Sequence, residues 1–197
     1  RGLLAHGQGE TLEKWLAACG AAGVTVPGAA LARAELLIRK GEMSAAAAVA
    51  RDTASHLTPD HADYAWACNA TGRALHFTSQ EEKALQAFEA GRQAAKTDED
   101  TKESLWGLVL AAAEVAPERM GEPLDELASD YSNDLDVRLR LAVGHALVDD
   151  LSSSLAGTWD RFEALLPGVR HSNNPLAAST FLASASAVAV LRGQYLI

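Results

Sequence analysis

Cysteine, positive charge and β-branched residues are all scarce in this chain of 197 residues, and each shortage excludes a class of protein. Cys19 and Cys68 are its only cysteines and lie far apart, which excludes a disulfide-rich secreted domain and favours a reducing cytoplasm. Seventeen basic against 26 acidic side chains give a net charge of −9, which repels phosphate backbones and anionic lipids. We therefore expect no direct binding to nucleic acid and none to a membrane.

Long apolar runs are also lacking. The uncharged stretch 176–191 has sixteen residues, rich in alanine and serine, and falls short of the roughly 20 strongly apolar residues that cross a bilayer. We interpret it as a buried helix. The chain has only 2 isoleucines and 11 valines against 40 alanines and 27 leucines, a bias toward helix formers and away from strand formers. The composition predicts an all-α protein.

Capping residues and apolar periodicity divide the chain into helices joined by short polar turns. Gly20 is expected to close the first helix, Thr58 with Pro59 to open the fourth, and Ser79 with Glu82 to form a capping box for the fifth. Seven helices are predicted with both ends, over 10–19, 27–40, 43–56, 59–77, 100–116, 122–131 and 175–191. Another helix is expected to run from the Ser79 cap to 96, one to begin at 134, and one to run from a cap at Ser152 or Ser153 to 166.

Small and large residues recur at fixed steps in two successive helix pairs. A small residue on the first helix is followed after twelve, four and three residues by positions on the second. These positions are Gly72, Ala84, Phe88 and Gly91 in one pair and Ala34, Ala46, Ala50 and Thr53 in the pair before it. Because two helices approach closely only where side chains are small, the pattern predicts helical hairpins that nest against one another.

This pattern resembles the tetratricopeptide repeat, and the turn 39–42 (Arg-Lys-Gly-Glu) is common in that family. The resemblance implies a right-handed superhelical array of antiparallel helix pairs, with about 4.5 repeats after an N-terminal helix or cap over 1–26. Further centres near Ala112, Gly144 and Ser186 give a mean spacing of about 38 residues, against the family's 34. The expected hairpins are 27–57, 58–97, 98–132, 133–170 and a truncated 174–197.

The Ala-rich, acidic repeats are similar to the sensor arrays of bacterial signal-transduction ATPases and of large LuxR-type or antibiotic-regulatory transcription activators. That similarity implies a non-enzymatic sensor or scaffold segment of a larger intracellular bacterial regulator, with effector domains outside this chain. Residues 191–195 look like the start of another family turn. We therefore expect the last hairpin to lack its second helix and to expose one apolar face of 176–191.

In the family, the first helices of successive pairs line the inner surface, which takes peptides or partner helices. Asn69 and Arg73, one turn apart, are candidates to clamp a peptide backbone and a carboxylate, with Trp66 as an aromatic anchor. The alternative is that Trp66 packs between repeats and Arg73 pairs with acidic neighbours. The full set of inner-face candidates is Glu35, Arg39, Trp66, Asn69, Arg73, His76, Trp106, Arg138 and His145.

No residue set predicts a reaction, a metal site or a cofactor. The six histidines form no pair with metal-ligand spacing, and Cys68 falls on an apolar stripe typical of an inert core thiol. A rival hypothesis is an all-α enzyme or small-molecule binding domain with a pocket lined by Trp66, His76, Trp106 and His145. A third is a structural spacer without a ligand.

Overall fold

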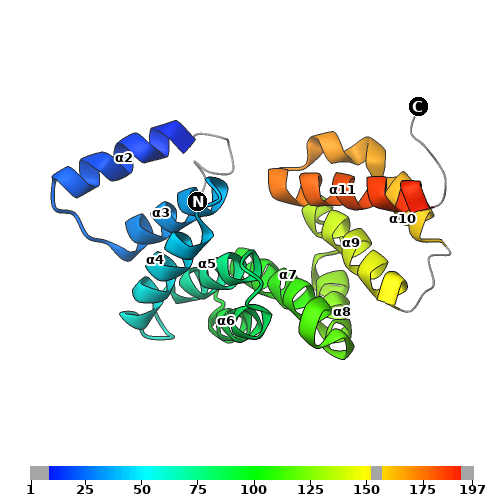
Figure 1. Cartoon of the computed structure of the whole chain (residues 1–197), viewed down its shortest axis with the longest axis horizontal. Coiled ribbons are helices and arrows are strands. Elements are labelled where there is room, and N and C mark those ends of the chain that lie inside the picture. Colours follow the sequence, from blue (N-terminus) through cyan, green and yellow to red (C-terminus); the bar gives the residue numbers. More distant parts are fainter. Residues whose placement is uncertain (1–8, 152–156, 192–197) are drawn as a thin grey trace. The chain divides into compact units, whose positions relative to one another are not determined.

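A computed structural model describes residues 9–151 and 157–191, and within these ranges the chain is all-α, as predicted. Figure 1 shows the order of the helices along the chain. The α-helices are α2 (Gly9–Ala21), α3 (Pro27–Arg39), α4 (Met43–Ser55), α5 (Tyr64–His76), α6 (Glu81–Ala94), α7 (Asp98–Val115), α8 (Gly121–Tyr131), α9 (Leu135–Leu151), α10 (Thr158–Leu165) and α11 (Pro175–Leu191). Two short 3₁₀ helices lie between them: η1 (Pro117–Arg119) connects α7 to α8, and η2 (Leu166–His171) connects α10 to α11.

The chain separates into two compact units, Arg1–Ala116 and Pro117–Ile197. The boundary falls inside the expected hairpin 98–132, so that α7 belongs to the first unit and α8 to the second. Pro117 comes two residues after the end of α7 and has no backbone N–H with which to continue the helix.

Within the first unit, α5 is the central helix and contacts α3, α4, α6 and α7. The Phe88 ring of α6 fills the space between α5 and α7. A Cβ atom added at Gly72 would lie 2.8 Å from that ring, and one added at Gly107 would lie 2.2 Å from it. The absence of a side chain at both glycines therefore lets the ring fit between the two helices.

The approach of Phe88 to Gly107 joins α6 to the helix of the next predicted pair. Ala112, the predicted small residue of that pair, lies five residues after Gly107 on the same helix. Ala112 is buried as well. Both residues are small and lie on one helix, so composition alone does not distinguish them.

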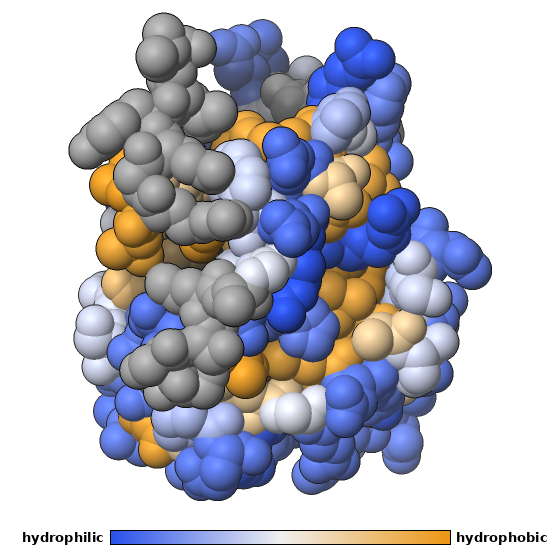
Figure 2. Space-filling view, turned by 90° about the vertical axis from the view of Figure 1, so that its right-hand side faces the viewer, coloured by the Kyte–Doolittle hydropathy of each residue, from blue (hydrophilic) through white to orange (hydrophobic). Residues whose placement is uncertain are grey.

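Within the second unit, α9 contacts α8, α10 and α11. The aromatic rings of Phe162 on α10 and Phe181 on α11 pack with centroids 5.0 Å apart and planes tilted by 47°. The opposite side of α11 is open: its exposed large apolar residues are Leu176, Leu182, Val190 and Leu191. Helix α11 is therefore buried on one side and exposes apolar residues on the other, so it is not buried all round as we interpreted it from the sequence. Figure 2 shows apolar surface among hydrophilic residues on the side of the molecule that lies to the right in Figure 1.

Local hydrogen bonds cap the ends of several helices. The hydroxyl of Thr97 accepts a hydrogen bond from the backbone N–H of Asp100 at the start of α7. Asn174 accepts from the N–H groups of Leu176 and Ala177 at the start of α11. Gly41, with φ +79°, ends α3 in the left-handed conformation. The backbone N–H of the next residue then bonds to the carbonyl of Leu37, as in a Schellman motif.

Three predicted caps are wrong. The first helix ends at Ala21, and Gly23 rather than Gly20 takes positive φ. The fourth begins at Tyr64 instead of Pro59, because hydrogen-bonded turns occupy residues 58–63. The expected capping box at Ser79 does not form, because Ser79 itself takes the left-handed conformation (φ +54°) that ends α5. The expected cap at Ser152 or Ser153 and the turn at 192–195 lie outside the described residues.

Candidate functional site

A linked set of polar side chains lies where α5 meets α3 and α7. The Arg73 guanidinium on α5 pairs with Glu35 on α3, and its Nη1 lies 3.3 Å from Oε2 of Glu103 on α7. The indole Nε1–H of Trp66 donates to Oε1 of Glu35 at 3.1 Å. We call Glu35, Trp66, Arg73 and Glu103 the polar bridge. Three of its members were expected at the inner face, and the structure brings those three together.

The polar bridge is shielded from solvent. The side chain of Glu35 is 14% exposed, that of Glu103 18% and that of Arg73 23%. Burial opposes the positive charge of Arg73, but the carboxylates of Glu35 and Glu103 outweigh it and raise the pKa of Arg73 above its ordinary value. Two carboxylates therefore occupy the terminal nitrogens of the guanidinium.

This pairing changes the role expected for Arg73. A ligand carboxylate that reached Arg73 would have to replace Glu35 or Glu103 and would meet the repulsion of the remaining carboxylate. Trp66 is likewise buried and bonded to Glu35 instead of projecting as a free anchor. The alternative reading, in which Trp66 packs between helices and Arg73 pairs with acidic neighbours, matches these contacts, except that the pairs are half-buried and not solvated.

Asn69 lies between helices and away from any open surface. Only 2% of it is exposed; its amide nitrogen donates to the backbone carbonyl of Asp100 at 3.1 Å, and its oxygen accepts from the Ser104 hydroxyl at 2.8 Å. A Cβ atom added at Gly91 would lie 2.5 Å from the Asn69 side-chain oxygen. Asn69 therefore joins α5 to α7, and its amide is not presented to a peptide backbone.

Each of the other candidates of the first unit lies about one helical turn after a member of the polar bridge. Arg39 is exposed, one turn after Glu35 on α3, and Trp106 on α7 is half-buried. His76, also half-buried, has Nδ1 at 2.9 Å from Oε2 of Glu81, a residue of the following helix. His76 thus connects the end of α5 to the start of α6.

Arg138 and His145 lie on α9 in the second unit. Arg138 is exposed and His145 half-buried. Burial and the nearby Arg161 guanidinium lower the pKa of His145, against the opposing effect of Asp149 and Asp125. Asp149 accepts from the Thr158 hydroxyl at 2.8 Å and from Arg161 Nη1 at 2.5 Å, so it ties α9 to α10.

Two residues that contact members of the polar bridge or share a cluster with them were not among the candidates named from the sequence. Glu103 completes the polar bridge 30 residues after Arg73, and the acidic stretch at the start of α7 gives no sign of which carboxylate turns inward. Leu12 of α2 belongs to the buried cluster that contains Leu31, Ala32 and Trp66. A leucine pair one turn apart, Leu12 and Leu16, is the sequence signal that predicts such a contact.

One open hollow of about 350 Å³ lies elsewhere in the first unit. Its lining residues are Pro59, Asp60, Tyr64, Ala90, Gln93, Ala94, Ala95 and Lys96. The ammonium of Lys96 donates to the Asp60 backbone carbonyl at 2.5 Å across it. None of Trp66, His76, Trp106 and His145 lines this hollow.

Cys68 is buried as expected, and burial raises the pKa of its thiol, which disfavours the reactive thiolate. In the part of the chain that the structure describes, no three His, Cys, Asp or Glu side chains gather in a way that could hold a metal ion. None of the described helices has the length and apolar character to cross a membrane. Comparison with known families, curated proteins and solved structures finds no match for the chain.

Proposed function

We propose that the chain is a non-enzymatic helical-repeat module that binds a protein or peptide on the face shared by α3, α5 and α7. The resemblance to bacterial sensor arrays extends the proposal to a sensor or scaffold segment of a larger intracellular bacterial regulator. A ligand would act by binding one curvature of the repeats more tightly than another, which biases attached effector domains.

The observation that carries this proposal is the pairing of residues about one repeat apart. Glu35 meets Arg73 at a separation of 38 residues, Trp66 meets Glu35 at 31, and Asn69 meets Ser104 at 35. Contacts at these separations are those expected when the first helices of successive hairpins lie next to one another and present one continuous surface. A surface of this kind recognises extended peptides or helices.

The experiment is a peptide-display selection on the full chain, followed by fluorescence-anisotropy titration of the selected peptides. Arg39→Glu changes an exposed residue of α3, one turn from Glu35, and Arg51→Glu makes the same charge reversal at an exposed residue of α4. We expect Arg39→Glu to change the affinity by about fivefold or more, because charges at the rim of a binding surface affect recognition, and Arg51→Glu to leave it unchanged.

Two results would contradict the proposal. One is a selection that enriches no peptide. The other is a set of peptides whose affinity responds to Arg51→Glu but not to Arg39→Glu, since that places the binding surface on the second helices.

A further inference from the structure

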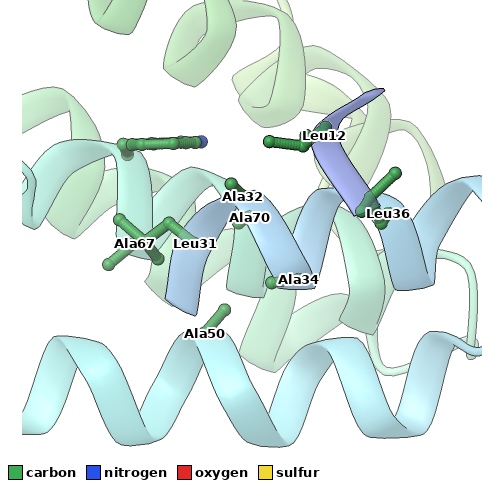
Figure 3. Packing of buried hydrophobic residues seen from close by; sticks show 9 residues of the cluster. Leu12, Leu31, Ala32, Ala34, Leu36, Ala50, Ala67 and Ala70 are labelled. Atoms are coloured by element: carbon green, nitrogen blue, oxygen red, sulfur yellow. The ribbon is translucent and has the colours of Figure 1, made fainter. Parts of the chain in front are cut away.

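Helix α2 packs against α3, and its buried residue joins an apolar cluster that α3 and α5 share. Leu12, the buried residue of α2, belongs to one cluster with Ala32 and Leu36 of α3 and with Trp66 and Ala70 of α5, and Leu16 packs against that cluster. Figure 3 shows Leu12 directed toward the side chains of these two helices. The helix thus adds to an apolar cluster that contains Trp66, a member of the polar bridge.

The side chains packed under α2 suit the docking of a helix, and we call the surface they form the groove. Ala32 and Ala70 are small and let a helix approach closely, while Leu36 and Trp66 provide apolar walls. Gly9 of α2 lies near Leu36, because a Cβ atom built there would be 3.9 Å from the Leu36 Cδ2 atom. Lys40, just after α3, pairs with Glu13 of α2 at 2.7 Å. The groove therefore takes a leucine pair on one helix face and an acidic side chain beside it.

The attachment of α2 is slight in comparison with that of the helices beneath it. Only one of its thirteen residues is buried, whereas ten of the thirteen residues of α5 are. Trp15 of α2 is 62% exposed, and the Glu13–Lys40 pair is about half-exposed on both sides, where an ion pair contributes little. The connection from α2 to α3 includes Gly23 in the left-handed conformation and the exposed Val24 and Val26.

We propose that α2 is an exchangeable, intramolecular occupant of this groove. The partner it excludes is an amphipathic helix with two leucine-sized residues one turn apart and a carboxylate placed to reach Lys40. Such a helix competes with α2 for the same contacts and displaces it. The proposal rests on the proposed function and specifies the chemistry of the ligand at that face.

The test uses the full chain and a fluorescein-labelled peptide of residues 9–21, with Ser replacing Cys19. The release variant is Leu12→Asp/Leu16→Asp, which places charges on the buried side of α2. Its matched control is Trp15→Asp/Ala18→Asp, which adds the same charge on the exposed side of the same helix. Affinity is measured by fluorescence anisotropy.

We expect the peptide to bind the release variant at least about tenfold more tightly than it binds the unchanged chain or the control, because the tethered helix competes at a high effective concentration. A peptide carrying Leu12→Asp is expected to lose at least about tenfold in affinity for the release variant. Equal affinity for all three chains would overturn the proposal.

Hydrogen exchange on the unchanged chain gives a second measurement that does not depend on how the variant folds. We expect the α2 amides to exchange at least about a hundredfold faster than those of α5, because α2 opens without the rest of the unit. Equal protection of α2 and α5 would show that α2 is a fixed part of the unit and would overturn the proposal. A dimer that the release variant converts to a monomer would assign the groove to α2 of a second copy and overturn the intramolecular arrangement.

These outcomes separate the inference from the proposed function. A result in which selected peptides respond to Arg39→Glu, while the α2 peptide binds the release variant and the unchanged chain equally, would support the proposed binding face. The same result would contradict the proposal that α2 occupies that face. Failure of the display selection alone removes the general proposal, whereas the α2 measurements still decide whether this helix exchanges.

Discussion

Helices α5 and α11 show opposite relations between composition and burial. α5 carries Trp66, Asn69, Arg73 and His76 among its thirteen residues, yet ten of the thirteen are buried. α11 has no charged residue among seventeen, yet only five are buried. The more polar helix is therefore the more deeply enclosed of the two.

The difference comes from the number of neighbours around each helix. α5 contacts α3, α4, α6 and α7, so that nearly its whole circumference is covered and its polar groups must bond to other protein groups. α11 contacts α9 and α10, which cover one side only. The amino-acid composition of a helix therefore does not predict how much of it is buried, because burial depends on how many other helices surround it.

Removal of the Phe88 ring is the strongest test of the enclosure of α5. We expect Phe88→Ala to lower the free energy of unfolding by about 3–5 kcal/mol, because the ring is fully enclosed between α5 and α7. Hydrogen exchange of the α5 amides measures the loss in this region. Phe77→Ala, at a ring that is 49% exposed, is the control, and a similar loss in both variants would show that α5 is not packed as described.

A smaller effect is expected where a methyl group is added to the same contact. Gly107→Ala places a Cβ atom 2.2 Å from the Phe88 ring, which Gly72 confines from the other side, so we expect a loss of about 1–3 kcal/mol in a urea titration. Gly20→Ala, in a helix position with no atom within 4 Å of the new Cβ, is expected to be neutral or to stabilise by up to about 1 kcal/mol. The same sign for both variants would contradict the close contact at Gly107.

The end of α5 permits a stabilising change. Ser79 occupies the left-handed conformation without being glycine, so Ser79→Gly is expected to raise the free energy of unfolding by about 0.5–1 kcal/mol, after allowance for the greater freedom of glycine in the unfolded chain. Gly41→Ser, at the equivalent position after α3, is the converse and is expected to destabilise by about 1 kcal/mol. Thermal unfolding of both variants checks the pair, and a destabilised Ser79→Gly would show that the serine side chain is needed there.

The open side of α11 predicts the smallest effect. Val190 is 60% exposed and Val188 is 6% exposed on the same helix. We expect Val190→Gln to change the free energy of unfolding by less than about 0.5 kcal/mol, because surface substitutions rarely do more. Val188→Gln is expected to cost about 2 kcal/mol, because it buries an amide among apolar side chains. Equal losses in urea titrations would mean that the open side of α11 is covered in solution.

Most helices are predictable from the sequence because their ends are marked by local chemistry. Gly41, Thr97 and Asn174 act at helix ends through bonds to backbone groups a few residues away, which depend little on the rest of the fold. The prediction at Thr58 and Pro59 is wrong because a proline after a threonine fits a turn as well as a helix start.

The candidate site is only partly predictable. The spacing of Glu35, Trp66 and Arg73 along the chain is enough to place them on one face, and the structure brings them together. It is not enough to show that Glu35 and Glu103 occupy the Arg73 guanidinium, that Asn69 is enclosed, or that α2 covers the groove. The first two facts depend on contacts between helices that no local pattern encodes. For α2, the pair of Leu12 and Leu16 marks the side of the helix that packs but does not show which helices it meets.

By itself, the sequence determined that this chain is helical and where most of its helices begin and end, because backbone hydrogen bonding, caps and periodicity act over a few residues. Only the tertiary structure decided which helices are enclosed, which glycine receives the Phe88 ring, and where the chain divides at Pro117. The physical reason is that burial and ion pairing depend on which surfaces meet. Residues 30 or more positions apart must come into contact before their burial or pairing contributes to stability.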